Sequence, residues 1–118
     1  MTIKPTVNVY RFVNPFKSVK ADGKKLKLQK GELSLKVKYV TKKKKIKVSL
    51  RLKKGWKVKS VTTKIIVFET ADMIKYKTLN CKLSGLTQRN PDSTYYEITA
   101  VNKKTKVSEK LVLEIATS

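Results

Sequence analysis

The 118-residue sequence contains no histidine and one cysteine, Cys81. A single chain of this composition can form neither a disulfide framework nor a metal site of histidine and cysteine ligands. The four glycines, at positions 23, 31, 55 and 85, lie too far apart for a phosphate-binding glycine loop. Among the eight carboxylates the nearest candidates for an acid/base pair are Glu69 and Asp72, which we interpret as part of a solvated turn. We therefore expect a protein that is not an enzyme and needs no cofactor.

Signals for export and for membrane insertion are also missing. No stretch approaches the roughly 20 apolar residues of a membrane span. The opening residues, Met1 to Pro5, lack the basic and then apolar layout of a secretory signal. We therefore expect a protein made in the cytoplasm without a signal peptide, which stays there or leaves by lysis, for instance within a virion.

The chain is strongly basic, with a net charge of +21. Its hydrophobic content of 40% is ordinary for a globular protein, so we expect a single domain over residues 1–118 with its charge at the surface. Such a field attracts nucleic acid, anionic lipid, acidic glycans and acidic proteins alike. Only three of the 29 basic residues are arginines, which disfavours specific readout of bases or phosphates. A coding bias of the source toward lysine would give the same composition.

Residues 33–53 contain the clearest pattern, two apolar-alternating runs that flank four lysines at 42–45. This period of two is typical of half-buried strands. A loop of even length, such as 41–44, would set Tyr39 opposite Ile46 and keep all apolar residues on one side. The parity therefore predicts an antiparallel hairpin with one apolar face and one cationic face.

Further strands are expected at residues 7–13, 25–29, 56–59, 61–69 and 76–83, and on both sides of a loop at 103–106. The last hairpin should align Ile98 with Leu111 and Tyr96 with Leu113. Residues 14–22 show turn signals and little periodicity, so we expect a loop there. The continuous apolar run at 61–69 predicts a strand covered on both faces. We expect Cys81 to be a small core residue, and we predict an all-β antiparallel sandwich of seven to nine strands or a barrel.

The C-terminal third carries a family resemblance. The run Leu83-Ser84-Gly85-Leu86-Thr87, followed by 94–102, by Val107-Ser108-Glu109 and by a final strand, resembles the closing half of a fibronectin type III or related immunoglobulin-like domain. In that family a leucine precedes a tyrosine whose ring fills the corner between the last strands. The resemblance implies these roles for Leu86 and for Tyr95 or Tyr96. It also implies an immunoglobulin-like β-sandwich, a fold that hosts many binding functions.

The central hairpin and the strand after it gather basic residues into a candidate surface for an anionic partner. These residues are Lys36, Lys38, Lys42, Lys43, Lys44, Lys45, Lys47, Arg51, Lys53, Lys57 and Lys59. Clustered like charges repel in the isolated domain, and an anionic partner would relieve that repulsion. The alternative is a solvated lysine-rich edge that prevents sheets from aggregating.

Two functional hypotheses follow. The first is a non-enzymatic structural or interaction module that docks through its basic face on the acidic protein surface of a large assembly, as part of an oligomer. By analogy, the small auxiliary (decoration) proteins of tailed-phage capsids are such modules. The second is a sequence-nonspecific nucleic-acid binder whose lysines follow phosphates while Tyr95, Tyr10 or Phe12 stack on bases. A binder of membrane surfaces or acidic glycans has less support, because no amphipathic helix is expected.

Overall fold

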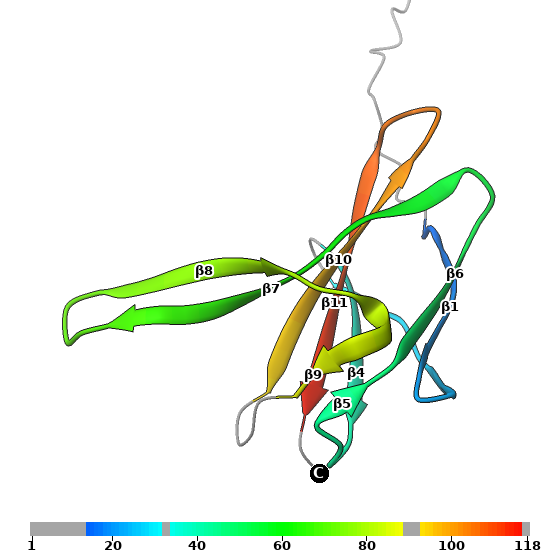
Figure 1. Cartoon of the computed structure of the whole chain (residues 1–118). Helices are drawn as coiled ribbons and strands as arrows, with labels where there is room; N and C mark the ends of the chain where they lie inside the picture. The colour runs from blue at the N-terminus through cyan, green and yellow to red at the C-terminus, as the bar shows by residue number, and fades with distance from the viewer. Residues whose placement is uncertain (1–13, 32–33, 89–92, 117–118) are drawn as a thin grey trace, which may run out of the picture.

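The chain forms an all-β sandwich, seen here in a computed structural model that describes residues 14–31, 34–88 and 93–116 (Figure 1). One sheet has six strands in the order β3-β4-β11-β10-β7-β8, another has the order β2-β1-β6, and β5 pairs with β9. In chain order the elements are β1 (Phe16–Ala21), β2 (Lys24–Leu26), β3 (Gln29–Lys30), β4 (Leu35–Val40), β5 (Lys45–Ile46), β6 (Val48–Leu52), β7 (Trp56–Glu69), β8 (Ile74–Asn80), the 3-10 turn η1 (Leu83–Gly85), β9 (Leu86–Thr87), β10 (Thr94–Asn102) and β11 (Ser108–Ala116). The all-β prediction is confirmed, with more strands in the described residues than expected, although those expected at 56–59 and 61–69 form one strand, β7.

The core lies between the six-stranded and three-stranded sheets, where alternate side chains of both point inward. On β4 the residues Leu35, Val37 and Tyr39 are buried, whereas Lys36 and Lys38 are exposed. The other fully covered side chains include Phe16, Val19, Ile98, Leu111, Leu113 and Ile115. Burying each large apolar side chain contributes about 1.5–3 kcal/mol, so the period-two pattern fixes which face of each strand is inside.

The hairpin of β10 and β11 has the predicted register. Ile98 lies opposite Leu111 and Tyr96 opposite Leu113, with the turn at 103–106. The expected all-antiparallel arrangement is wrong at one place, because β4 runs parallel to β11. The C-terminal strand is therefore central, with β10 on one side and β4 on the other.

The predicted central hairpin is wrong, although its strands exist. β4 pairs with β11 and β3, whereas β6 pairs with β1 and β5 pairs with β9. The chain thus crosses from one sheet to the other between Val40 and Lys45. Alternation determines which face of a strand is buried but says nothing about its partner, and this is why both arrangements fit the same pattern.

The loop expected at residues 14–22 is also wrong, because Phe16–Ala21 is the middle strand of the three-stranded sheet. Its buried apolar residues are Phe16, Val19 and Ala21, and the register shifts between Phe16 and Ser18. Such a bulge adds a residue and breaks the alternation, which hides the strand in the sequence. The predicted turn at Asp22 and Gly23 is present, with φ of 50° and 83°. The strand predicted at 7–13 lies outside the described residues.

Strand β7 is not covered on both faces along its length. β10 pairs with β7 only as far as Thr62, and beyond this point β7 pairs with β8 alone. We call residues 64–78 the arm; in Figure 1 it projects to the left of the sandwich. Val67 and Phe68 are 54% and 48% exposed there, so the expectation of burial over 61–69 is wrong for the part of the strand in the arm, although Val61 and Thr63 are buried. Cys81, at the base of the arm, is half-buried and packs against the core.

A tyrosine ties the two-stranded sheet to the six-stranded one. The Tyr96 hydroxyl donates a hydrogen bond to the Thr87 carbonyl oxygen at 2.6 Å and accepts one from the Thr87 N–H at 2.9 Å. Tyr96 and the neighbouring Leu86 are both almost fully buried, whereas Tyr95 is 55% exposed. Of the two tyrosines considered from the sequence, Tyr96 is therefore the buried one that is bonded to a neighbouring strand.

We expect Tyr96→Phe to lower the free energy of unfolding by about 1–2 kcal/mol, because it leaves both backbone groups of Thr87 without their partner. Urea denaturation measures this change. Tyr95→Phe is the matched control and should change the unfolding free energy by less than about 0.5 kcal/mol. Equal effects of the two substitutions would contradict the role assigned to Tyr96.

Candidate functional site

The outward side of the three-stranded sheet is basic and has no carboxylate. None of its strands β1, β2 and β6 contains an Asp or Glu. Lys20 and Arg51 are exposed on the side opposite the buried Val19 and Val48. Lys25 joins them, since it lies directly opposite Lys20 in the sheet. We call the surface of these three basic residues, together with Ser18 and Ser49 between them, the cationic face.

The register brings like charges together on the cationic face. Lys20 lies between Lys25 on one neighbouring strand and Ser49 on the other, and Ser18 lies opposite Arg51. Side chains directly opposite in an antiparallel pair are about 5 Å apart at Cβ, and like charges placed so destabilise the sheet. A bound anion would offset this repulsion. The small serines leave the basic side chains accessible.

The outward side of the six-stranded sheet has interleaved charges instead. Lys38 lies beside Glu114 with 3.9 Å between the ammonium and a carboxylate oxygen, and Ser93 Oγ donates to the same oxygen at 3.0 Å. Glu97 faces outward two residues along from Tyr95. On the inward side of β11, burial raises the pKa of Glu109. This sheet therefore carries acidic residues that the cationic face lacks.

The basic residues predicted from the sequence are all exposed but do not share one face. Lys36 and Lys38 project outward from the six-stranded sheet on one side of the sandwich. Arg51 projects outward from the three-stranded sheet on the other side. The remaining predicted residues are distributed over the link Lys42 to Lys45, the junction at Lys47, the end of β6 at Lys53, and β7 at Lys57 and Lys59. The residues predicted to share one face of a hairpin thus lie on different parts of the surface, and their role in binding a partner stays a prediction.

Sequence reasoning missed Lys20, because its strand was interpreted as a loop, and it missed Lys25, because the partner of the strand predicted at 25–29 was not recognised. The composition of the segment, and not its periodicity, indicated a basic surface there. Residues 16–31 contain six lysines and one carboxylate, Asp22. A basic segment of this kind would have identified the cationic face once its strand was recognised.

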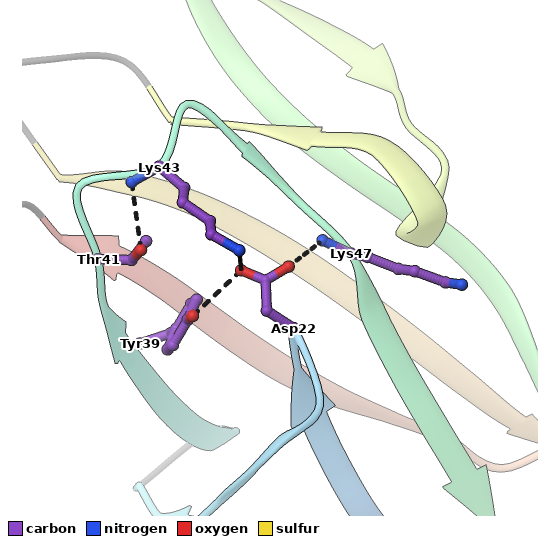
Figure 2. A network of polar contacts seen from close by, with 5 residues as sticks. All are labelled: Asp22, Tyr39, Thr41, Lys43 and Lys47. Carbon is purple, nitrogen blue, oxygen red and sulfur yellow. Dashed lines mark hydrogen bonds and ion pairs between the residues drawn. The ribbon is translucent and has the colours of Figure 1, made fainter.

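Asp22 connects the cationic face to the lysine-rich link between β4 and β5 (Figure 2). Its Oδ1 accepts a hydrogen bond from the Lys47 N–H at 3.1 Å, and its Oδ2 accepts one from the Tyr39 hydroxyl at 3.1 Å. The Lys43 ammonium is 4.0 Å from Oδ2, and the Asp22 N–H donates to the Lys47 carbonyl oxygen at 2.8 Å. The backbone bond from Lys47 lowers the pKa of Asp22 against a smaller opposing effect of desolvation, with further lowering by Tyr39, Lys43 and Lys24.

The backbone of the lysine link is held by hydrogen bonds, and its side chains lie at the surface. The Lys43 N–H donates to Thr41 Oγ1 at 3.2 Å, and the Gln88 N–H donates to the Lys44 carbonyl oxygen at 2.7 Å. The side chains of residues 42–45 are all exposed. The link therefore presents basic groups on an ordered backbone beside the turn that follows β1.

The chain matches no protein-family model, no curated protein and no solved structure. In the described ranges, no helix has the length and apolar character needed to cross a membrane. Within the same ranges no group of three acidic or cysteine side chains is placed to hold a metal ion.

The charge of Asp22 should stabilise the fold in a pH-dependent way. Its folded-state pKa lies below the unfolded value of 3.8, so its contribution is complete above that pH and is lost as the pH falls through the folded-state pKa. We expect Asp22→Asn, which keeps a side chain tolerant of positive φ, to cost about 1 kcal/mol at neutral pH, with the difference from wild type shrinking in acid.

Denaturant unfolding across this pH range measures the difference. Asp72→Asn, in the exposed turn of the arm, makes the same change in net charge and should have little effect at any pH. A difference for Asp22→Asn that stays constant from neutral pH into strong acid would contradict the role of the charge.

Proposed function

We propose that the protein is a non-enzymatic interaction module that binds an acidic protein surface of a larger assembly through its cationic face. The observation that carries this proposal is a sheet surface without any carboxylate in its strands, on which Lys20 and Lys25 lie directly opposite each other. Such a pairing opposes folding of the isolated chain and is relieved by a negative partner. The net charge of +21 also accelerates encounter with that partner.

The same lysines support nucleic-acid binding as the alternative, but the surroundings favour an acidic protein. Base stacking needs aromatic side chains among the cations. Ser18 and Ser49 occupy the positions between the basic residues, and the exposed Tyr95 lies on the other sheet beside Glu114. The other aromatic residues expected to stack, Tyr10 and Phe12, lie outside the described residues.

The immunoglobulin-like or fibronectin type III-like form of the sandwich is also part of the proposal. The buried Leu86 and the hydroxyl bonds of Tyr96 support it, because the family places a leucine and a tyrosine at that corner. Sandwiches of this type supply binding surfaces without chemistry of their own. A decoration protein on a virion is one form that such a module takes, and the analogy with tailed-phage auxiliary proteins motivates it.

Neutralising the cationic face should weaken binding selectively. We expect the triple variant Lys20→Gln, Lys25→Gln, Arg51→Gln to bind polyglutamate at least about tenfold more weakly than wild type, a loss of about 1.4 kcal/mol. Isothermal titration calorimetry at near-physiological salt, repeated with duplex DNA and heparin at equal charge, measures this loss. Preference for DNA over both other polyanions would favour the nucleic-acid alternative.

The control is a variant with the same change in net charge on the six-stranded sheet, Lys36→Gln, Lys57→Gln, Lys110→Gln. It should retain binding to within about twofold, because its residues lie outside the cationic face. Equal losses in the two variants would mean that binding follows net charge alone, and the proposal would fail.

Sedimentation from the native lysate, with and without nuclease, tests the assembly itself. We expect the protein to stay with a particle of megadalton size after nuclease treatment. Release by nuclease would support the nucleic-acid alternative. Sedimentation as a free monomer with and without nuclease would contradict both functional hypotheses.

A further inference from the structure

The arm carries a second surface, which is separate from the cationic face. From Thr63 onward β7 pairs only with β8, and in the described part of the chain β8 has no strand on its other side. Figure 1 shows the two strands running away from the sandwich, and the molecule measures 61 × 41 × 23 Å along its principal axes. The seven residues of β8 therefore form an open edge with unpaired backbone groups.

Side chains along this edge alternate in character. Lys75 and Lys77 share one face of β8, and Ile74 and Tyr76 share the other. Ile74 and Tyr76 are 46% and 59% exposed, unusually high for side chains of their size. Five of the eight large hydrophobic side chains that are exposed in the described residues belong to the arm or its turn: Val67, Phe68, Met73, Ile74 and Tyr76. A concentration of this kind marks an interaction surface.

Charge disfavours a second copy of the chain at this edge in the two registers centred on Tyr76 and Lys77. Antiparallel pairing of two β8 strands about Tyr76 sets Lys75 opposite Lys77 of the other copy, and pairing about Lys77 sets that lysine opposite itself. Like charges directly opposite destabilise a sheet, and lysines on edge strands prevent self-pairing in this way. The net charge of +21 on each copy adds to the repulsion.

The lysines that repel a second copy would attract carboxylates at the same positions. We propose that the β8 edge binds an extended segment of a partner protein in which acidic residues alternate with apolar ones. The added strand would pair with the free backbone groups of β8, setting its acidic residues beside Lys75 and Lys77 and its apolar residues beside Ile74 and Tyr76.

An anionic membrane is a poorer occupant than such a strand. Glu69 and Asp72 lie at the outer end of the arm and are both exposed. An anionic bilayer approached by this end would meet two carboxylates first, whereas a strand paired along β8 leaves them in solvent. This inference does not rest on the cationic face, which lies on the other sheet.

A short synthetic peptide of alternating glutamate and valine is the probe for this proposal. We expect it to bind the full chain and to slow amide hydrogen exchange in β8. A peptide of the same composition, with its glutamates and valines in separate blocks, should bind at least about tenfold more weakly. Equal binding of the two peptides would overturn the proposal, because only net charge would then matter.

Backbone pairing is tested by N-methylation of alternate amides in the same peptide. A strand presents only one of its two alternate sets of N–H groups to β8. Methylation of that set should abolish binding, and methylation of the other set should not. Tolerance of both methylated peptides would exclude addition of a strand.

The charge requirement is tested in the protein. We expect Lys75→Glu with Lys77→Glu to weaken peptide binding at least about tenfold, whereas Lys103→Glu with Lys104→Glu, in the turn between β10 and β11, should change it less than about twofold. Equal losses would overturn the proposal. Sedimentation of wild type as a dimer that the Lys75 and Lys77 substitutions disrupt would identify a second copy as the occupant instead.

Binding of the peptide to the arm can be distinguished from binding to the cationic face. The triple variant at Lys20, Lys25 and Arg51 should bind the alternating peptide to within about twofold of wild type. Loss of peptide binding in that variant, with β8 exchange unchanged by the peptide, would place the peptide on the cationic face and overturn the proposal for β8.

Discussion

After β4 the chain crosses from the six-stranded sheet toward the three-stranded one, and the rest of the structure depends on this crossing. It determines whether the lysines on either side of it project from one outer surface of the sandwich or from the other. β4 buries Leu35, Val37 and Tyr39 in the six-stranded sheet, and β6 buries Val48 from the opposite layer. Asp22 holds the two layers together at this point by accepting hydrogen bonds from Tyr39 in one and from Lys47 in the other. A single carboxylate thus links the turn after β1, the sheet crossing and the lysine link.

Separation of charge between the sheets follows from this arrangement. The six-stranded sheet receives Glu97 and Glu114 on its outer side, so its lysines have acidic neighbours. The three-stranded sheet receives none, and its basic residues face one another. The lysines are therefore unevenly accompanied by carboxylates in space, and this unevenness gives a lysine-rich chain a surface with a defined location.

Much of the local structure could be predicted from the sequence, because alternation reports which face of a strand is buried. The register of β10 and β11 follows directly, since a short turn leaves few ways to align Ile98 with an apolar partner. The strands that pair with β4 and β6 could not be predicted, because the sequence of a strand does not show which distant segment of the chain it pairs with. β1 was hidden by its bulge, and the cationic face was hidden with it. The apolar run of β7 misled for a further reason, since an exposed apolar strand has the same composition as a buried one.

The parallel pairing of β4 with β11 has a consequence during synthesis. Leu35 and Leu111 lie in adjacent strands although they are 76 positions apart in the sequence, so the sheet cannot close until β11 has left the ribosome. Long-range pairing of this kind is slow, because the entropy of closing a long loop is lost before the contact forms. In that interval the apolar side chains of β4 are open to other nascent chains. Lys36 and Lys38 alternate with them, and charges placed among the apolar residues of a strand oppose its aggregation.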